Sequence, residues 1–157
     1  MTCSPLEALG PSSSRIIDFV ALKKGWVTGV LDCTSAFFHA PETEEVYVKP
    51  PAEWLAGHIE NGGDPTVMWR LLKQLPGRRT AGVRWIDFAK GVLTNELNLE
   101  RCESNPCFYK EDGKSLLELH MDDIHVTARS ESEYEDLISK IREHLAIVAS
   151  PPLVAGS

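Results

Sequence analysis

The stretch LLELHMDDIHVTA, which runs from Leu116 to Ala128, is the part of the sequence that decides the fold. Apolar and polar residues alternate on both sides of Asp122-Asp123, which is the pattern of two β-strands with one buried face. With Asp122-Asp123 as a two-residue loop, Met121 pairs with Ile124 and all the apolar residues fall on one face. A register slip of one residue would destroy that separation, because side chains alternate with a period of two. The sequence therefore predicts an antiparallel hairpin with an acidic turn.

Three aspartates are candidate metal ligands. Asp122 and Asp123 are adjacent in the predicted turn, and adjacent carboxylates repel each other unless a cation or a proton lies between them. Asp32 directly follows an apolar strand predicted from Trp26 to Leu31. If this strand lies beside the hairpin, the three carboxylates converge. Mg²⁺ prefers oxygen ligands and binds through one or two carboxylates together with substrate phosphates. The alternative interpretation of Asp122-Asp123 is an ordinary acidic turn exposed to solvent.

Length and composition are those of one globular domain. The chain has 157 residues, of which 43% are hydrophobic, enough for a single sizeable core. The net charge of −7 counts against a stand-alone nucleic-acid binder, because neutralising phosphates requires an excess of Lys and Arg. No apolar run reaches membrane-spanning length, and the beginning of the chain does not resemble a signal peptide. The four scattered cysteines fit a reducing compartment, so we expect an intracellular, cytoplasmic protein without membrane contact.

Helices and strands are predicted in an irregular order along the chain. The predicted helices run to Lys24 from a cap at Ser12–Ser14, from Thr80 to Leu97, and onward from the capping box Ser130–Glu133. The predicted strands outside the hairpin are Trp26–Leu31, Glu45–Lys49, Thr66–Leu72 and Cys107–Lys110, and a polar loop is predicted from Gly57 to Pro65. This order favours an α+β fold, in which an antiparallel sheet packs on helices along one face.

Five stretches of the sequence match, in order, the motifs of a known family. They are DCTSAFFH (Asp32–His39), EEVYVKPP (Glu44–Pro51), LPGRRTAGVRW (Leu75–Trp85), SNPCFY (Ser104–Tyr109) and HMDDI (His120–Ile124). The first resembles the palm motif D-V-x-x-A-F-L-x-G, and the last resembles Y-V-D-D-I. Because order and spacing hold from about Pro5 to Leu145, the chain resembles the reverse transcriptase of copia-type retrotransposons, an RNA-directed DNA polymerase.

The resemblance implies both a fold and a chemistry. It implies a reverse-transcriptase palm with partial fingers in residues 1–149. The tail of residues 150–157, which contains Pro151-Pro152, is predicted from its own sequence to be disordered. Asp32, Asp122 and Asp123 would be the catalytic carboxylates that hold two Mg²⁺ ions, with Mn²⁺ as an alternative. The implied reaction is nucleotidyl transfer from a dNTP to a primer on an RNA or DNA template, within a larger Pol polyprotein.

The resemblance also implies roles for residues around the carboxylates. The implied nucleotide-binding residues are Cys33, Phe37, Gly77 and Arg79, and the implied primer-proximal residues are His120 and Met121. Phe37 would act as the aromatic gate that excludes a 2′-hydroxyl, and Gly77 would let the backbone approach the nucleotide and template. Trp85 is predicted to pack in the core instead of contacting substrate.

Departures from the family motifs leave other hypotheses open. His120 replaces a tyrosine, and Leu75–Trp85 is the most altered of the motifs. A second hypothesis is a truncated, catalytically inactive retroelement remnant or interaction module. A third is an unrelated acidic α+β binding domain. The sequence also leaves open whether Arg78, Arg79 and Arg84 contact nucleic acid.

Overall fold

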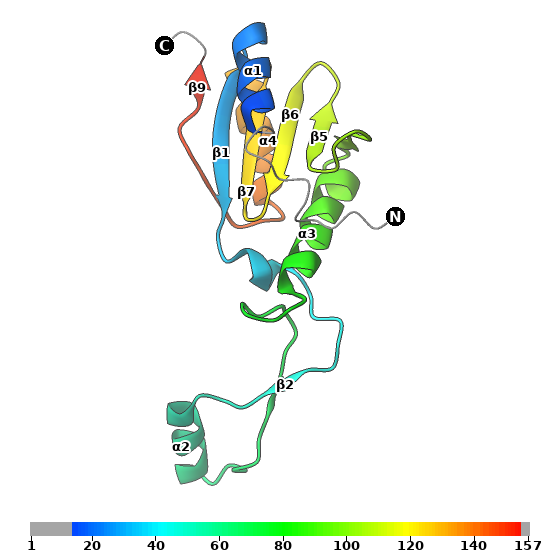
Figure 1. Cartoon of the computed structure of the whole chain (residues 1–157). Helices are drawn as coiled ribbons and strands as arrows, with labels where there is room; N and C mark the ends of the chain where they lie inside the picture. The colour runs from blue at the N-terminus through cyan, green and yellow to red at the C-terminus, as the bar shows by residue number, and fades with distance from the viewer. Residues whose placement is uncertain (1–13, 155–157) are drawn as a thin grey trace.

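The computed structural model describes residues 14–154, and its central element is a seven-stranded sheet (Figure 1). The strands of this sheet are β1 (Val27–Cys33), β4 (Glu100–Arg101), β5 (Phe108–Glu111), β6 (Ser115–His120), β7 (Asp123–Ala128), β8 (Ile147–Ala149) and β9 (Leu153–Val154). Their order is β4-β5-β6-β7-β1-β8, β9 also pairs with β1, and every pairing is antiparallel. Together with the helices, this antiparallel sheet makes an α+β fold, as the sequence predicted.

Four α-helices accompany the sheet in the described part of the chain. They are α1 (Ser14–Lys24), α2 (Ala52–Glu60), α3 (Ala81–Gly91) and α4 (Glu131–Arg142), with a 3₁₀ helix η1 (Ala36–His39) and a π-helical turn η2 (Val92–Glu96). The helix predicted from Thr80 to Leu97 is confirmed as α3 continued by η2. The predicted capping box is also confirmed, because Ser130 Oγ accepts a hydrogen bond from the Glu133 amide at 3.2 Å. The predicted cap at Ser12–Ser13 lies outside the described residues.

The hydrophobic core lies between one face of the sheet and helices α3 and α4. Alternate residues of the central strands are buried there, as the hairpin pattern predicted: Leu31, Leu117, Leu119, Ile124, Val126 and Ala128. Across from them pack Trp85 and Ala89 of α3 and Tyr134, Ile138 and Ile141 of α4. Trp85 is only 1% exposed, which confirms its predicted place in the core.

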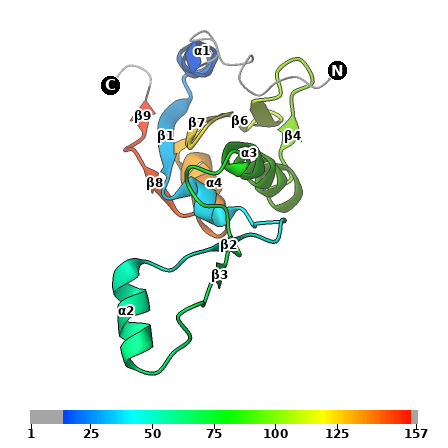
Figure 2. The ribbon, with the colours of Figure 1, turned by 60° about the horizontal axis from the view of Figure 1, so that its bottom comes forward.

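Helix α1 covers the opposite face of the sheet, so the expectation of helices on one face only was wrong. Ile17 and Ala21 of α1 are buried. Asp18 pairs with His125 of β7, with Oδ1 3.3 Å from Nε2. Figure 2 shows α1 and α4 on opposite sides of the sheet. Because both faces are covered, Glu118, a polar residue of β6, has no solvent exposure.

The hairpin of β6 and β7 forms, but its turn lies one residue earlier than predicted. His120 pairs with Asp123, so the two loop residues are Met121 and Asp122 instead of Asp122 and Asp123. Each predicted pair is thereby shifted by two positions, which keeps the apolar residues of the two strands on the expected face. Met121, which was predicted opposite Ile124 on that face, is instead an exposed loop residue. Met121 takes the positive φ, 54°, that tight hairpin loops require.

A long arm, residues 40–78, leaves the sheet between η1 and α3 and carries α2 at its tip (Figure 1). Its two sides pair antiparallel at β2 (Tyr47–Val48) and β3 (Trp69–Arg70). These strands are shorter than the predicted Glu45–Lys49 and Thr66–Leu72. Helix α2 also takes up part of the segment predicted as a polar loop, Gly57–Pro65.

The last described residues run along the free edge of β1, which corrects the prediction of a disordered tail from residue 150. Strand β8 pairs with the end of β1, and β9 pairs with Val27 and Thr28 at its beginning. Between them, the Ser150 amide donates to the Val30 carbonyl at 2.9 Å. Pro151-Pro152 does not prevent this pairing, because prolines are tolerated on an edge strand. The folded domain therefore extends to Val154 and does not end at residue 149.

Candidate functional site

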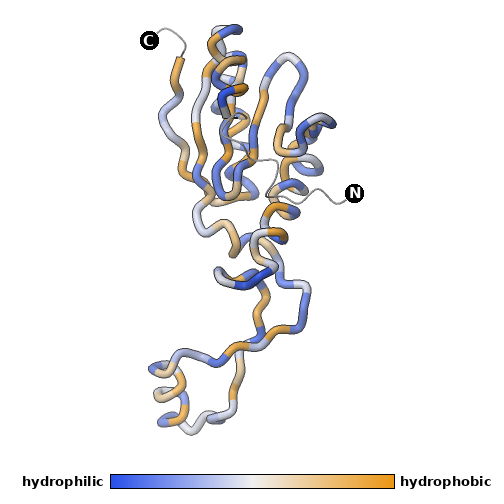
Figure 3. The backbone as a smooth tube through the Cα atoms, viewed as in Figure 1, coloured by the Kyte–Doolittle hydropathy of each residue, from blue (hydrophilic) through white to orange (hydrophobic). Residues whose placement is uncertain are grey.

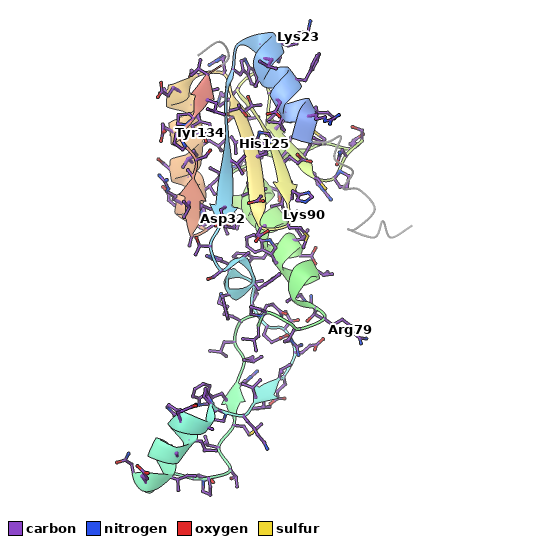
Figure 4. The ribbon with its side chains drawn as sticks, turned by 60° about the vertical axis from the view of Figure 1, so that its left-hand side comes forward. Lys23, Asp32, Arg79, Lys90, His125 and Tyr134 are labelled. Carbon is purple, nitrogen blue, oxygen red and sulfur yellow. The ribbon has the colours of Figure 1, made fainter. Side chains whose placement is uncertain are left out.

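Asp32 and Asp123 lie directly opposite each other on neighbouring strands. The antiparallel register of β1 and β7 aligns these two residues at the end of the pairing. Residues opposite each other in such a ladder have Cβ atoms about 4.5–5.5 Å apart. Both aspartates are exposed, and Figure 4 shows Asp32 at the end of β1 that faces the arm. The strand predicted to end at Asp32 thus lies beside the hairpin.

Asp122 joins this pair through the backbone of the turn. The Cys33 amide donates to the Asp122 carbonyl at 2.8 Å, which ties the turn to the end of β1. The electrostatic surroundings of the Cys33 thiol agree with this placement. Burial raises its pKa to about 12, and the charges of Asp32, Asp122 and Asp123 add to the increase. All three carboxylates therefore act on one buried thiol.

The surroundings of the Asp123 carboxyl raise its pKa. Partial burial raises the pKa of its carboxyl, and the neighbouring charges of Asp122 and Asp32 raise it further. His120, which pairs with Asp123 across the hairpin, lowers the pKa and so opposes the increase. Repulsion of this kind disfavours three negative charges together and favours a bound cation or a proton.

Trp85 fixes the shape of the acidic turn. Its indole Nε1 donates a 2.6 Å hydrogen bond to the carbonyl of Met121, the residue with the positive φ. Trp85 itself is buried in the core and lies 6.1 Å, ring to ring, from His39 of η1. Sequence analysis placed Trp85 in the core but missed this polar contact, because nothing in a sequence pairs an indole with a carbonyl 36 positions away.

The three aspartates fit a divalent cation by chemistry, but they are not assembled into a binding group. Carboxylate oxygens are the ligands that Mg²⁺ prefers. Among residues 14–154, no three His, Cys, Asp or Glu side chains are arranged so that they hold a metal ion. Asp32, Asp122 and Asp123 are all exposed, and their side chains would have to turn toward one another to hold an ion.

Two of the expected nucleotide-binding residues lie against the core. Cys33 is 2% exposed and its thiol belongs to the hydrophobic core. A nucleotide contact by the thiol is therefore not supported, and only the backbone of Cys33 lies at the site. Phe37 of η1 is half-buried and packs against the same core, whereas Phe38 beside it is 48% exposed.

The other two expected nucleotide-binding residues lie in the exposed turn before α3. Gly77 has a φ of 92°, and a Cβ added there would meet no atom within 4 Å. The glycine is thus required by the backbone conformation, and the space in front of it is open. Arg79 is exposed, and Figure 4 shows it pointing outward at the start of α3.

Arg78 is engaged within the protein. Its Nε lies 2.9 Å from Glu42 and its second guanidinium nitrogen lies 3.0 Å from Glu44, so it joins the two sides of the arm. The side chain of Glu42 is only 1% exposed there. The open question about the arginines is therefore partly answered, since Arg78 has a structural role. Sequence analysis missed this pair, because opposite charge alone does not show that residues 36 positions apart lie side by side.

A family model matches almost the whole chain. The model of the family described as reverse transcriptase (RNA-dependent DNA polymerase) matches residues 2–151. The chain therefore belongs to the reverse transcriptase family, as its motifs predicted.

Curated relatives come from yeast retrotransposons. The chain is 25% identical over 123 residues to the Transposon Ty1-DR4 Gag-Pol polyprotein of Saccharomyces cerevisiae, which covers 78% of this chain and 7% of the relative. The Transposon Ty1-DR6 and TyH3 Gag-Pol polyproteins match equally well, with 6% of each covered. The chain thus spans less than a tenth of the length of these relatives.

No helix within residues 14–154 is long and apolar enough to cross a membrane.

Proposed function

We propose that this chain is the palm, with part of the fingers, of a copia-type reverse transcriptase, in which a dNTP is joined to a primer. The observation that carries the proposal is the register of β1 against β7, which sets Asp32 beside Asp123 with Asp122 in the adjoining turn. Carboxylates on two strands and one turn, exposed at the same end of a sheet, are suited to hold metal ions against substrate phosphates.

Asp32, Asp122 and Asp123 would hold two Mg²⁺ ions, with Mn²⁺ as an alternative. Such a pair of ions activates an attacking hydroxyl and stabilises the leaving oxygen of the phosphate. The residues of the chain contribute position and charge. The pKa of Asp123 is raised by burial and further by repulsion from Asp122 and Asp32. A bound cation would relieve this repulsion, so the metal-free cluster has a physical reason to take up ions.

Substrate contacts are assigned around this end of the sheet. We assign Phe37 of η1 to the sugar of the nucleotide, Gly77 to close backbone approach, and Arg79 to the phosphates. His120 and Met121, which flank the acidic turn, are assigned to the primer terminus. The role of Cys33 is limited to its backbone bond with the turn, because its thiol is buried.

Partners follow from the same proposal. The substrates are a dNTP and an RNA or DNA template with its primer. Because the net charge is −7, a firm grip on a duplex requires cationic surface from elsewhere. The relatives are Gag-Pol polyproteins, so we propose that the rest of a Pol polyprotein supplies this surface, in the cytoplasm.

Primer extension is the direct test of this proposal. The chain is incubated with a labelled primer on an RNA template, dNTPs and Mg²⁺, and Mg²⁺ binding is measured in parallel by calorimetry. We expect Mg²⁺ binding for the unmodified chain, extension when the rest of a Pol polyprotein is supplied in the same assay, and loss of both signals in Asp122→Asn. Asp87→Asn, which removes an exposed aspartate from α3, is the matched control and should change neither.

An inactive retroelement remnant or interaction module is the second candidate, and the acidic charge favours it. Mg²⁺ binding without extension, even when the rest of the polyprotein is supplied, would support this candidate, because the ligands would then persist without catalysis. The catalytic proposal fails when the chain shows neither extension nor Mg²⁺ binding and Asp122→Asn behaves like the unmodified chain.

A further inference from the structure

The tip of the arm exposes a cluster of aromatic side chains. We call Trp54, His58 and Trp69 the tip cluster. The Trp54 ring stacks on His58 with centroids 4.7 Å apart and meets Trp69 edge-on at 5.0 Å. Trp54 nevertheless remains 41% exposed and Trp69 39% exposed. Exposed apolar side chains gathered in one place, as opposed to scattered, mark an interaction surface.

Helix α2, which carries two of the three residues of this cluster, lacks the packing that normally stabilises a helix. It has nine residues, and none of them is buried. Isolated helices shorter than about 12–15 residues are marginal in water, because most helix stability in proteins comes from packing one face. A surface that covers Trp54 would therefore also stabilise α2.

Helix α1 exposes a second apolar surface at the other end of the molecule. Ile16, Phe19 and Leu22 are 47%, 59% and 70% exposed, and we call them the α1 stripe. Their spacing of three residues sets them along one side of the helix. This side points away from the sheet, because Ile17 and Ala21 are the residues that pack against it. Figure 3 shows hydrophobic residues in both α1 and the arm.

The two helices at these surfaces carry opposite net charges. Helix α2 contains two acids, Glu53 and Glu60, and neither Lys nor Arg, so it carries −2. Helix α1 contains Arg15, Lys23 and Lys24 against one acid, Asp18, which gives +3 − 1 = +2. Opposite potentials favour encounter and fix the orientation of two apolar surfaces.

We propose that the tip cluster of one copy of this chain docks on the α1 stripe of a second copy. The two surfaces lie at opposite ends of the elongated molecule (Figure 1), so an antiparallel pair of copies brings each arm to the other copy's α1. Such a pair is closed by a twofold axis, which is the commonest symmetry of protein oligomers. This inference stands apart from the polymerase chemistry, because it uses neither the aspartates nor the nucleotide contacts.

Sedimentation of charge-reversed variants tests the pairing. Variant one carries Arg15→Glu and Lys23→Glu in α1, and variant two carries Glu53→Lys and Glu60→Lys in α2. We expect the unmodified chain to dimerise with a Kd on the order of 10 µM, as for a small interface, and more weakly as NaCl is raised. Each variant alone should associate at least roughly tenfold more weakly.

Mixing the two variants is the decisive measurement. In an equimolar mixture both contacts of the pair are again between opposite charges, so the dimer should return. A control with Glu135→Lys and Glu143→Lys, both exposed on the outer side of α4 or just after it, should dimerise like the unmodified chain. A chain that is monomeric at all concentrations, variants that associate unchanged, or a mixture that stays monomeric would each overturn the proposal. Far-UV circular dichroism verifies that every variant is folded.

Discussion

The hydrogen bond from Trp85 to the Met121 carbonyl connects the core to the acidic turn. Trp85→Phe keeps an aromatic ring in the core and removes the donor. We expect a loss of about 1–3 kcal/mol in the free energy of unfolding, from a lost hydrogen bond and lost volume. We also expect faster hydrogen exchange of the Cys33 amide, because this amide bonds to the next residue of the turn, Asp122. Urea titration and NMR measure the two effects.

A matched control separates the turn from general loss of packing. Phe88 packs against Trp85 with ring centroids 6.4 Å apart and does not bond to the turn. Phe88→Leu should destabilise the chain while leaving exchange of the Cys33 amide close to its original rate, after correction for global unfolding. Equal acceleration in both variants would show that Trp85 acts on the turn only through packing.

Charge repulsion at Asp123 predicts a gain in stability on neutralisation. The pKa of Asp123 is raised above its ordinary value of 3.8, so the folded state binds this proton more tightly than the unfolded state. Stability of the metal-free chain therefore falls as pH rises through the raised pKa. In EDTA at neutral pH, Asp123→Asn should have a Tm higher by on the order of 1 °C. A lower Tm in thermal unfolding contradicts the repulsion.

At the residue scale, the sequence predicted the buried face of the hairpin but not its turn. Strict alternation identified Leu117, Leu119, Ile124 and Val126 correctly, because a shift of two positions leaves every side chain on the same face. The position of the turn depends on Met121 accepting a strained backbone, and the Trp85 bond that supports it is a tertiary contact. The metal and nucleotide roles of the site residues stay predictions.

At the element scale, the ion pair of Arg78 with Glu42 holds the base of the arm together. Arg78→Met leaves the buried Glu42 carboxylate without its cation, whereas Arg79→Met changes an exposed neighbour. We expect the amides that link the two sides of the arm, Glu42 to Leu72 and Gln74 to Ala40, to exchange at least roughly tenfold faster in Arg78→Met only. Similar exchange in both variants would mean that the pair does not hold the arm.

The same ion pair predicts a pH dependence of the arm. Hydrogen bonding by the Glu44 amide lowers the pKa of Glu42 below its ordinary value of 4.5, and Arg78 lowers it further. A depressed pKa contributes stability that is fully present above 4.5 and is lost as pH falls through the folded value. Exchange at the base of the arm, corrected for intrinsic rates, should therefore accelerate in acid before the sheet is affected.

Elements whose formation depends on distant partners were the ones that the sequence did not reveal. Helix α2 has two glycines just beyond its end, Gly62 and Gly63, and no buried side, so its segment has the pattern of a loop. Strand β9 follows Pro151-Pro152 and exists because β1 offers a free edge. In contrast, α4 was predicted correctly, because its capping box and its apolar stripe are both local features.

At the scale of the whole molecule, the arm is separable from the core. The core cluster is built from the sheet, η1, α3, α4 and η2 and contains no residue of the arm. The Glu42 amide donates to the Leu72 carbonyl at 3.0 Å, so a two-residue Asn-Gly turn can replace residues 43–71. We expect this shortened chain to fold with a Tm within about 3 °C of the full chain, as changes away from the core cost little. Loss of cooperative unfolding in calorimetry would contradict separability.

The pairing of β1 with β7 also has a consequence for how the chain is made. Thr127 of β7 donates to the Val27 carbonyl across 100 residues of sequence. A ribosome adds about 5–20 residues per second, so β1 waits roughly 5–20 s for its central partner. Its other edge stays open longer still, because β8 and β9 are synthesised after β7. Unpaired strand edges can pair with those of other chains, so β1 is a site of mispairing during synthesis until its partners on both edges are made.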